Sequence, residues 1–283
     1  AGLPLVEDRK NPKLTTTYGV GQLILAAAES GVEKIIVGLG GSSTNDGGCG
    51  AAAAVGIKFY DKDGKEFVPT GGTTADIAKI DLSGRAKVLD QVEIVTMCDI
   101  DNPMYGPTGA SYIFGPQKGA DEAMVGELDA GIKNLSRVIA EATGEDISQV
   151  PGTGAAGAMG AGMIAFFGSR LQMGIQTVLD TVNFDEMIKD ADYIITGEGK
   201  LDSQSLRGKV VIGIAERAKK QNKNVIAVVG GADDSEIDKA YEMGVTAVFP
   251  INRLPQDFSI SRHHSKENLG YTVDNILRLL AAK

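Results

Sequence analysis

The chain has 283 residues, of which 43% are hydrophobic and 23% charged, proportions typical of a globular protein with a sizeable core. Its formal net charge of -9, without any basic stripe, argues against nucleic acid as a partner. No apolar run is long enough to span a bilayer, so we expect no membrane partner. The spacing of Cys49 and Cys98 fits neither a zinc site nor a redox pair and predicts reduced core thiols in a cytoplasmic protein.

The first predicted elements are a helix and a strand. Threonines at 15–17 precede an amphipathic pattern that ends at Gly31, which predicts a capped helix. The β-branched run at 35–37 predicts a strand buried on both faces. An alanine-rich segment at 50–55 predicts a second helix, whose N-terminus would attract an anion.

A glycine-rich loop at 38–48 connects that strand to the alanine-rich helix. Its polar residues are Ser42, Ser43, Thr44, Asn45 and Asp46. Ligands of open α/β sheets bind beyond the carboxyl ends of strands, so the loop predicts a binding site for a polar ligand. A long surface turn is the alternative interpretation.

A hairpin and a second strand follow. Residues 58–67 alternate in polarity around a Lys-Asp-Gly turn and predict a β-hairpin. The apolar run at 94–97 predicts a strand, and Asp99, Asp101 and Asn102 come directly after it. Two carboxylates and an amide can bind Mg²⁺ or a hydroxyl group. A solvated turn closed by the Asn-Pro pair is the alternative.

Two further motifs involve glycines. Lys118 lies between Gly115 and Gly119, just before a helix predicted to begin at Asp121. A lysine in this setting can contact a phosphate, although the stretch lacks the pattern G-x-x-x-x-G-K-[ST], and a surface lysine is the alternative. Residues 152–157, GTGAAG, match G-x-G-x-x-G without a convincing preceding strand. We therefore expect a closely packed helix there and no cofactor.

The last hundred residues alternate regularly between strand and helix patterns. Strands predicted at 193–195, 225–229 and 247–249, with helices between them, imply right-handed βαβ units and a parallel sheet. A final amphipathic helix follows, and its predicted buried face comprises Leu269, Val273, Ile276, Leu277 and Leu280. With a boundary near Asn183, we expect domains at 1–183 and 184–283, in line with the length of the chain.

The loop at 196–209, TGEGKLDSQSLRGK, follows the first strand of this region. Its carboxylates, Glu198 and Asp202, can bind Mg²⁺ or accept a proton, and Ser205 supplies a hydroxyl group. Arg207 and Lys209 are cations that can neutralise the oxygens of a phosphoryl group during transfer. A capped helix with ordinary exposed charges is the alternative.

Taken in order, five stretches resemble the bacterial glycerate kinase family: GLGGSSTNDGG, CDIDNP, GASYIFGPQKGA, PGTGAAGAMGAG and ITGEGKLDSQSLRGK. The resemblance implies ATP-dependent phosphorylation of glycerate, to 2-phosphoglycerate rather than 3-phosphoglycerate. It also implies an α/β fold with two α/β domains. One is Rossmann-like, with a flavodoxin-like parallel sheet that includes residues 184–283. The other is an inserted mixed α/β domain with glycine-rich loops, comprising residues 1–183.

The resemblance also has gaps. Family members carry an Asp-Ser-x-Lys motif and an acidic, glycine-rich motif near their N-terminus, and neither occurs in this sequence, which opens without Met. We therefore expect an N-terminally truncated chain of uncertain activity. The sheet in 184–283 should then leave a strand edge or an apolar face uncovered, which favours aggregation or pairing with another chain in a homo-oligomer. Ser43 and Lys200 replace the usual alanine and arginine, and both should be tolerated.

On this hypothesis, the γ-phosphoryl group of Mg·ATP is transferred to glycerate in a cleft between the domains. Residue type predicts Glu198 and Asp202 as catalytic and Mg²⁺-binding carboxylates, with Asp46 or Asp99 completing the acidic side. The residues predicted to bind ATP are Gly40, Gly41, Ser42, Asn45, Lys118, Ser205, Arg207 and Lys209.

Two hypotheses from other classes stay open. The chain could be a non-catalytic fragment of such an enzyme that binds a nucleotide or an organic acid, in which case ATP would bind without turnover. An NAD-dependent oxidoreductase would rest on GTGAAG alone, and the missing strand before this motif argues against it.

Overall fold

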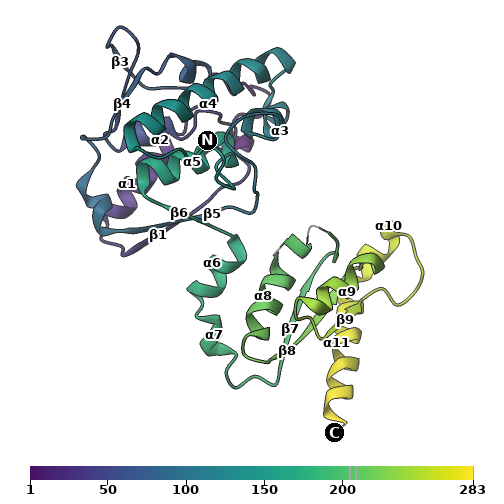
Figure 1. Cartoon of the computed structure of the whole chain (residues 1–283). Coiled ribbons are helices and arrows are strands. Elements are labelled where there is room, and N and C mark those ends of the chain that lie inside the picture. Colours follow the sequence, from purple (N-terminus) through teal and green to yellow (C-terminus); the bar gives the residue numbers. More distant parts are fainter. Residues whose placement is uncertain (204, 208, 283) are drawn as a thin grey trace. The chain divides into compact units, whose positions relative to one another are not determined.

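The computed structural model describes residues 1–203, 205–207 and 209–282. In these residues the chain is an α/β protein with three sheets of three strands each, of which two are parallel and one is antiparallel. It divides into two compact units, unit 1 (Ala1–Gln172) and unit 2 (Met173–Lys283), and Figure 1 labels most of their helices and strands. No helix in the described part of the chain is both long and apolar enough to cross a membrane.

Unit 1 combines a parallel sheet, an antiparallel sheet and packed helices. Its elements are η1 (Leu3–Leu5), α1 (Tyr18–Glu29), β1 (Lys34–Gly38), α2 (Cys49–Ala54), β2 (Lys58–Tyr60), β3 (Glu66–Phe67), η2 (Gly71–Asp76), β4 (Lys79–Asp81), η3 (Lys87–Gln91), β5 (Glu93–Met97), α3 (Ala110–Phe114), η4 (Pro116–Lys118), α4 (Glu122–Thr143), α5 (Ala155–Phe167) and β6 (Arg170–Gln172).

The parallel sheet of unit 1 has the order β1-β5-β6. The predicted strand at 35–37 is present as β1, but the expectation that it is buried on both faces is wrong. Ile35 belongs to the core, whereas Ile36 is 38% exposed. The reason is that β1 is an edge strand of the described sheet and alternate side chains point to opposite faces. Only the face bearing Ile35 packs against the core of unit 1.

The other elements predicted in unit 1 are confirmed. Strands β2 and β3 pair antiparallel as the expected hairpin, and β4 pairs with β2 on its other edge. Helix α4 begins at the predicted cap, where the carboxylate of Asp121 accepts a hydrogen bond from the Met124 N–H at 2.8 Å. Its five predicted core residues are buried, namely Val125, Leu128, Ile132, Leu135 and Ile139. Cys49 and Cys98 are also buried, as expected of core thiols.

Helix α5 packs very closely against the glycine-rich loop, as its small residues predict. A Cβ atom on Gly157, which has φ +72°, would lie 2.0 Å from the carbonyl oxygen of Thr44. A Cβ atom on Gly162 would lie 2.4 Å from the carbonyl oxygen of Gly47. These contacts explain Gly157 and Gly162 by close packing, because only glycine permits such an approach of two backbones.

Unit 2 contains a parallel sheet with helices on both faces. Its elements are α6 (Gly174–Thr181), α7 (Phe184–Met187), β7 (Tyr193–Glu198), η5 (Ser205–Arg207), α8 (Val210–Lys219), β8 (Asn224–Val229), α9 (Asp234–Glu242), β9 (Ala247–Pro250), α10 (Phe258–Ser261), η6 (Arg262–His264) and α11 (Ser265–Ala281). The strand order is β7-β8-β9 and both pairings are parallel, which confirms the predicted βαβ arrangement.

The two faces of β8 belong to different hydrophobic clusters. Val225, Ala227 and Val229 pack with residues of α8 and α9, whereas Ile226 and Val228 pack with α11. This alternation is the period of two expected for a strand covered on both faces. Strand β8 is therefore the centre of the unit 2 core.

The prediction for the apolar face of α11 is wrong for two residues. Ile276 is buried, with Val273 and Leu280 packed partly against the same cluster, but Leu269 and Leu277 are 44% and 51% exposed. The described sheet has only three strands, and the residues that contact α11 lie mainly in and around β8 and β9. That area covers a narrow stripe of the helix rather than its full apolar face.

β7 is an edge strand of the described sheet of unit 2, and its Ile195 is 43% exposed. This exposure is consistent with the expected uncovered apolar face, and its link to a missing segment stays a prediction. Helices α6 and α7 are attached to this unit, since Arg217 of α8 forms ion pairs with Asp180 at 2.5 Å and Asp185 at 2.7 Å. The domain ranges 1–183 and 184–283 remain a prediction beside the observed division after Gln172.

Candidate functional site

The glycine-rich loop of unit 1 turns most of its polar side chains inward. Ser43, Thr44, Asn45 and Asp46 are all buried. Of the predicted ligand contacts in the loop, Gly40 and Gly41 are exposed and Ser42 is half-buried. The loop is therefore less open to a ligand than its sequence suggests.

Asp46 is fully buried and serves the fold. Its carboxylate accepts hydrogen bonds from the N–H of Thr17 at 2.7 Å, the hydroxyl of Thr17 at 2.8 Å, and the N–H groups of Gly50 at 3.2 Å and Gly48 at 3.3 Å. Burial raises the pKa of Asp46 above its ordinary value, and these hydrogen bonds oppose that shift. The start of α2 thus receives an anion from within the chain.

The same carboxylate explains why the N-cap residue of the first helix does not use its side chain for the predicted cap, although Thr16 Oγ1 accepts from the Tyr18 N–H at 3.2 Å. Thr17 is the N-cap of α1, but its side chain makes no cap hydrogen bond. Its hydroxyl donates to Asp46 and accepts from the N–H of Ala51 at 2.9 Å. Thr17 therefore joins α1 to α2 through Asp46.

Lys118 is neither a surface lysine nor placed to meet a ligand in solution, because it is only 1% exposed. Its Nζ donates to the carbonyl oxygen of Thr44 at 2.6 Å. Burial lowers the pKa of Lys118 to about 8, and the negative charge of Asp46 opposes this shift. Lys118 thus stabilises the glycine-rich loop through its hydrogen bond to the backbone of Thr44.

Two oxygens of this buried cluster have no hydrogen-bond partner among the described residues, Thr44 Oγ1 and Asn45 Oδ1. The amide nitrogen of Asn45 donates to the hydroxyl of Ser111 at 3.1 Å. Asp99, by contrast, is exposed at the end of β5. Asp46 and Asp99 therefore do not share one environment within unit 1.

The acidic loop of unit 2 lies at the carboxyl end of β7. Glu198 is half-buried, and its Oε1 atom is buried without a hydrogen-bond partner in the described residues. Burial raises the pKa of Glu198, a hydrogen bond with Ser205 and the charge of Lys209 oppose the shift, and the charge of Asp202 adds to it. The structure therefore brings together four predicted residues, Glu198, Asp202, Ser205 and Lys209.

Hydrogen bonds fix the shape of this loop. The Asp202 N–H donates to the Ser205 hydroxyl at 3.2 Å, the Ser205 N–H donates to the Asp202 carboxylate at 3.3 Å, and the Ser205 hydroxyl donates to the carbonyl oxygen of Lys200 at 3.1 Å. The side chain of Arg207 lies outside the described part of the structure. Its predicted contact with phosphate stays a prediction.

The loops after the three strands of unit 2 are joined side by side. The Gly230 N–H, after β8, donates to the carbonyl oxygen of Glu198 at 3.1 Å. The Asn252 amide, after β9, donates to the carbonyl oxygen of Gly230 at 2.8 Å. A Cβ atom on Gly230 would lie 2.4 Å from the Gly199 carbonyl oxygen, so this approach requires glycine. The loops at the carboxyl ends of the three strands thus form a continuous row of polar groups.

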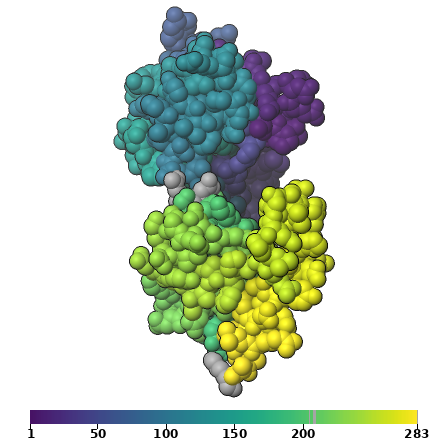
Figure 2. Space-filling view, turned by 90° about the vertical axis from the view of Figure 1, so that its right-hand side faces the viewer, coloured from purple at the N-terminus to yellow at the C-terminus, as the bar shows by residue number. Residues whose placement is uncertain are grey.

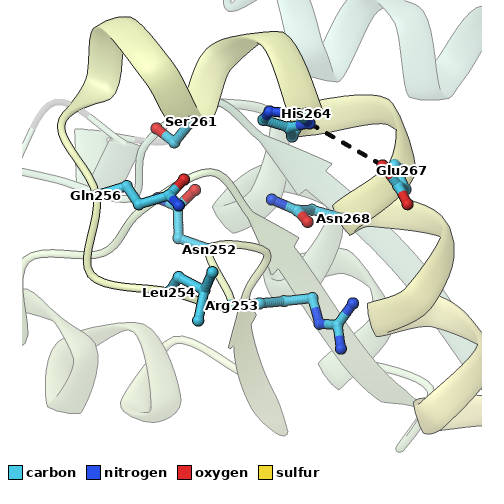
Figure 3. A pocket seen from close by; sticks show the side chains of 8 residues that line it. All are labelled: Asn252, Arg253, Leu254, Gln256, Ser261, His264, Glu267 and Asn268. Carbon is cyan, nitrogen blue, oxygen red and sulfur yellow. Dashed lines mark ion pairs between the residues drawn. The ribbon is translucent and has the colours of Figure 1, made fainter.

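A pocket of about 390 Å³ opens at the β9 end of this edge. Figure 3 shows its lining residues, which are Asn252, Arg253, Leu254, Gln256, Ser261, His264, Glu267 and Asn268. They come from the loop after β9 and from α10, η6 and α11. On the face drawn in Figure 2, this last part of the chain, coloured yellow, lies at the surface of unit 2.

The sequence analysis missed this pocket. The signal was present, because Asn252 and Arg253 follow a predicted strand of a parallel sheet just as Glu198 does. The amides and the hydroxyl group of the pocket carry no charge, so they were not among the predicted site residues.

Glu198 and Asp202 provide two carboxylates on one loop, which is the kind of ligand set that Mg²⁺ prefers. Mg²⁺ is commonly held by one or two carboxylates together with substrate phosphates. The unpartnered Oε1 of Glu198 is a suitable oxygen ligand, and the charge of Asp202 acts on the same carboxyl group. Among the described residues no group of three or more His, Cys, Asp or Glu side chains could hold a metal ion by itself.

Comparison with known proteins shows the family to which the chain belongs. The model of the glycerate kinase family matches residues 1–281. A glycerate kinase from Bacillus cereus is 45% identical over 277 residues, which are 98% of this chain and 72% of that protein. The glycerate 2-kinase of Escherichia coli strain K12 is 46% identical over 252 residues, which are 89% of this chain and 66% of that protein.

A solved structure is similar as well. The crystal structure of a candidate glycerate kinase 2 from Salmonella typhimurium LT2 matches with a TM-score of 0.85 and 39% identity, and the match covers 100% of this chain and 74% of that one. The chain thus spans 66% to 74% of the length of these three proteins. These likenesses define a phosphotransferase. The chain belongs to the glycerate kinase family.

Proposed function

We propose that the chain transfers the γ-phosphoryl group of ATP to glycerate and yields 2-phosphoglycerate. The family match over residues 1–281 carries this proposal. The position of the new phosphate is supported by the relative from Escherichia coli, which is named a glycerate 2-kinase and is 46% identical. On this proposal the substrates of the chain are glycerate and ATP, and we expect neither nucleic acid nor a membrane as a partner.

The chemistry is assigned to the acidic loop after β7. A carboxylate that accepts the proton of a hydroxyl group must lie within hydrogen-bond reach of that group. The Oε1 atom of Glu198 makes no hydrogen bond within the described residues, so Glu198 is our candidate for this base, and its other carboxylate oxygen is then the one that can bind Mg²⁺. Asp202 would hold Mg²⁺ with Glu198, and the ion would neutralise charge on the phosphoryl group during transfer.

Other residues have supporting roles in this proposal. Lys209 and Arg207 contact phosphate oxygens, and Ser205 shapes the loop through its hydrogen bonds to Asp202 and Lys200. Gly40, Gly41 and Ser42, together with Asp99, stay proposed ligand contacts at the surface of unit 1. Asp46, Lys118 and Asn45 are buried, so we assign them to holding the glycine-rich loop rather than to direct contact with substrate.

We further propose the finer architecture that the family resemblance implies. Unit 2 then forms part of a Rossmann-like domain with a flavodoxin-like sheet, and residues 1–183 form most of an inserted mixed α/β domain. The parallel order β7-β8-β9 supports the first part of this assignment. The buried, unpaired thiols of Cys49 and Cys98 suit a cytoplasmic location.

The proposal is tested by incubating the chain with Mg·ATP and glycerate, measuring ADP release, and identifying the product by phosphorus and carbon NMR. We expect ADP release that depends on glycerate and a phosphate on the 2-hydroxyl group. A phosphate on the 3-hydroxyl group would overturn the assigned product. Binding of ATP without ADP release would instead favour a non-catalytic nucleotide-binding fragment.

A further inference from the structure

The pocket at the carboxyl end of β9 takes no part in the chemistry assigned above. Its volume of about 390 Å³ lies in the range of about 300–1,000 Å³ typical of small-molecule sites. That is more room than a three-carbon acid fills. Its position beyond the ends of parallel strands is where open α/β sheets bind ligands.

The lining of the pocket is rich in side-chain amides. The side chains of Gln256 and Asn268 make no hydrogen bond or ion pair within the described residues, and Figure 3 shows both on the wall of the pocket. An amide group offers a donor and an acceptor side by side. Adenine presents the matching acceptor and donor at its N7 and N6 atoms, which Asn and Gln bind in a bidentate manner.

The charged residues of the pocket disfavour a polyphosphate in it. The guanidinium of Arg253 lies 4.4 Å from the centre of the Tyr271 ring and is already stacked there. His264 lies 4.0 Å from the carboxylate of Glu267, and that carboxylate would repel a phosphate. Leu254 adds an apolar surface that is 63% exposed. The pocket thus suits a neutral, flat and polar group.

The distance along the sheet edge fits a nucleotide. Neighbouring strands lie about 4.8 Å apart, so the ends of β7 and β9, with β8 between them, are separated by roughly 10 Å. The hydrogen bonds from Asn252 to Gly230 and from Gly230 to Glu198 connect the pocket to the acidic loop. A nucleoside triphosphate is long enough to reach from one to the other.

We propose that this pocket binds the adenine nucleoside of ATP through Gln256 and Asn268. The phosphates then extend past Gly230 towards Glu198 and Asp202. This inference rests on the proposed function in that ATP is the phosphoryl donor.

The test measures ATP binding by calorimetry without glycerate, so that binding is observed without turnover. Loss of one neutral hydrogen bond weakens binding about 3- to 10-fold, and we expect this for Asn268→Ala. The double variant Gln256→Ala/Asn268→Ala should bind roughly 10- to 100-fold more weakly. Asn275→Ala is the matched control, because Asn275 lies on the same helix, is exposed and is not part of the pocket lining. GTP should bind more weakly than ATP to the unmodified chain.

Each outcome decides a separate point. Unchanged ATP binding by the double variant, or equal affinity for ATP and GTP, would overturn the assignment of the pocket even if glycerate-dependent ADP release is observed. ATP binding that is weakened in the double variant and not in Asn275→Ala would support the pocket assignment, even if the chain releases no ADP. The absence of ADP release would count against the kinase function only. Absence of ATP binding by the unmodified chain would overturn the pocket assignment.

Discussion

Units 1 and 2 each contain a polar loop after a strand of a parallel sheet, but the two loops use their charged groups differently. In unit 1 the carboxylate of Asp46 accepts four close hydrogen bonds, and Lys118 is hydrogen-bonded to the backbone of the same loop. In unit 2 the carboxylate of Glu198 is half-buried and one of its oxygens has no partner in the described residues. The first loop holds its charged groups by hydrogen bonds within the fold, whereas we propose that the second presents a carboxylate to a ligand.

The comparison teaches that residue type alone does not distinguish these roles. Both loops combine glycines with acids and hydroxyl groups, which is why both were predicted as sites. The two loops differ in hydrogen bonding. A buried carboxylate that accepts several N–H hydrogen bonds is already stabilised within the fold and needs no ligand. Substitutions in the two loops should therefore affect different properties.

The largest effect on stability is expected for Asp46→Ala. The substitution leaves the donors of Thr17, Gly48 and Gly50 buried without their acceptor, which should lower the free energy of unfolding by about 3–5 kcal/mol. Urea unfolding followed by circular dichroism measures the change. Asp63→Ala in the exposed hairpin turn is the control and should change stability by less than about 0.5 kcal/mol. Equal stability of the two variants would refute the structural role of Asp46.

A second effect concerns Lys118 and pH. Its pKa is about 8 in the folded chain and near 10.5 when unfolded. Between these values the unfolded chain binds more protons, so stability rises with pH from about 8 to 10.5. Below about pH 8 the full cost of the buried charge is present, and the difference amounts to roughly 3 kcal/mol.

Lys118→Met provides the measurement. The variant should lack this gain, so the difference in unfolding free energy between the two proteins should change by roughly 3 kcal/mol between pH 8 and 10.5. Parallel stability curves for the two proteins over this interval would contradict the burial of a charged Lys118.

A smaller change in stability is expected for Asp202→Asn. Asp202 is half-buried, and its carboxylate accepts a hydrogen bond from the Ser205 N–H, which an asparagine oxygen can also accept. We expect a loss of at most about 1 kcal/mol in the free energy of unfolding, together with a clear loss of turnover. A loss as large as that of Asp46→Ala would remove the difference between the two loops.

The smallest effect is expected for Thr44→Val. The Thr44 hydroxyl is buried without a partner in the described residues, whereas its backbone carbonyl still accepts from Lys118 after the substitution. Replacing an unpaired hydroxyl by a methyl group should be neutral or slightly stabilising, within about 1 kcal/mol. A clear destabilisation in thermal unfolding would show that this hydroxyl has a partner in solution.

Much of the fold followed from the sequence. The periodic elements were predictable because their apolar spacing is strong, as in α4, or because their strands are short apolar runs between turns, as in β8. The exposure of Ile36, Leu269 and Leu277 was not predictable, because it depends on where the sheets end and not on local pattern. Edge strands and central strands can carry the same apolar run.

The candidate site followed from the sequence less completely. Glu198, Asp202, Ser205 and Lys209 are close in sequence and were brought together by one loop, so their grouping was predictable. The inward direction of Asp46 and Lys118 was not, since it depends on contacts with Thr17 and Thr44 across the fold. Gln256 and Asn268 were missed because isolated amides carry no distinctive pattern.

The most direct test of the account is the turnover and the stability of Glu198→Gln measured on the same preparation. We expect glycerate-dependent ADP release to fall at least about 100-fold, because the carboxylate proposed to accept the proton is removed. The urea midpoint should stay close to that of the unmodified chain. Turnover equal to that of the unmodified chain, with the protein folded, would contradict the assignment of the chemistry to the loop after β7.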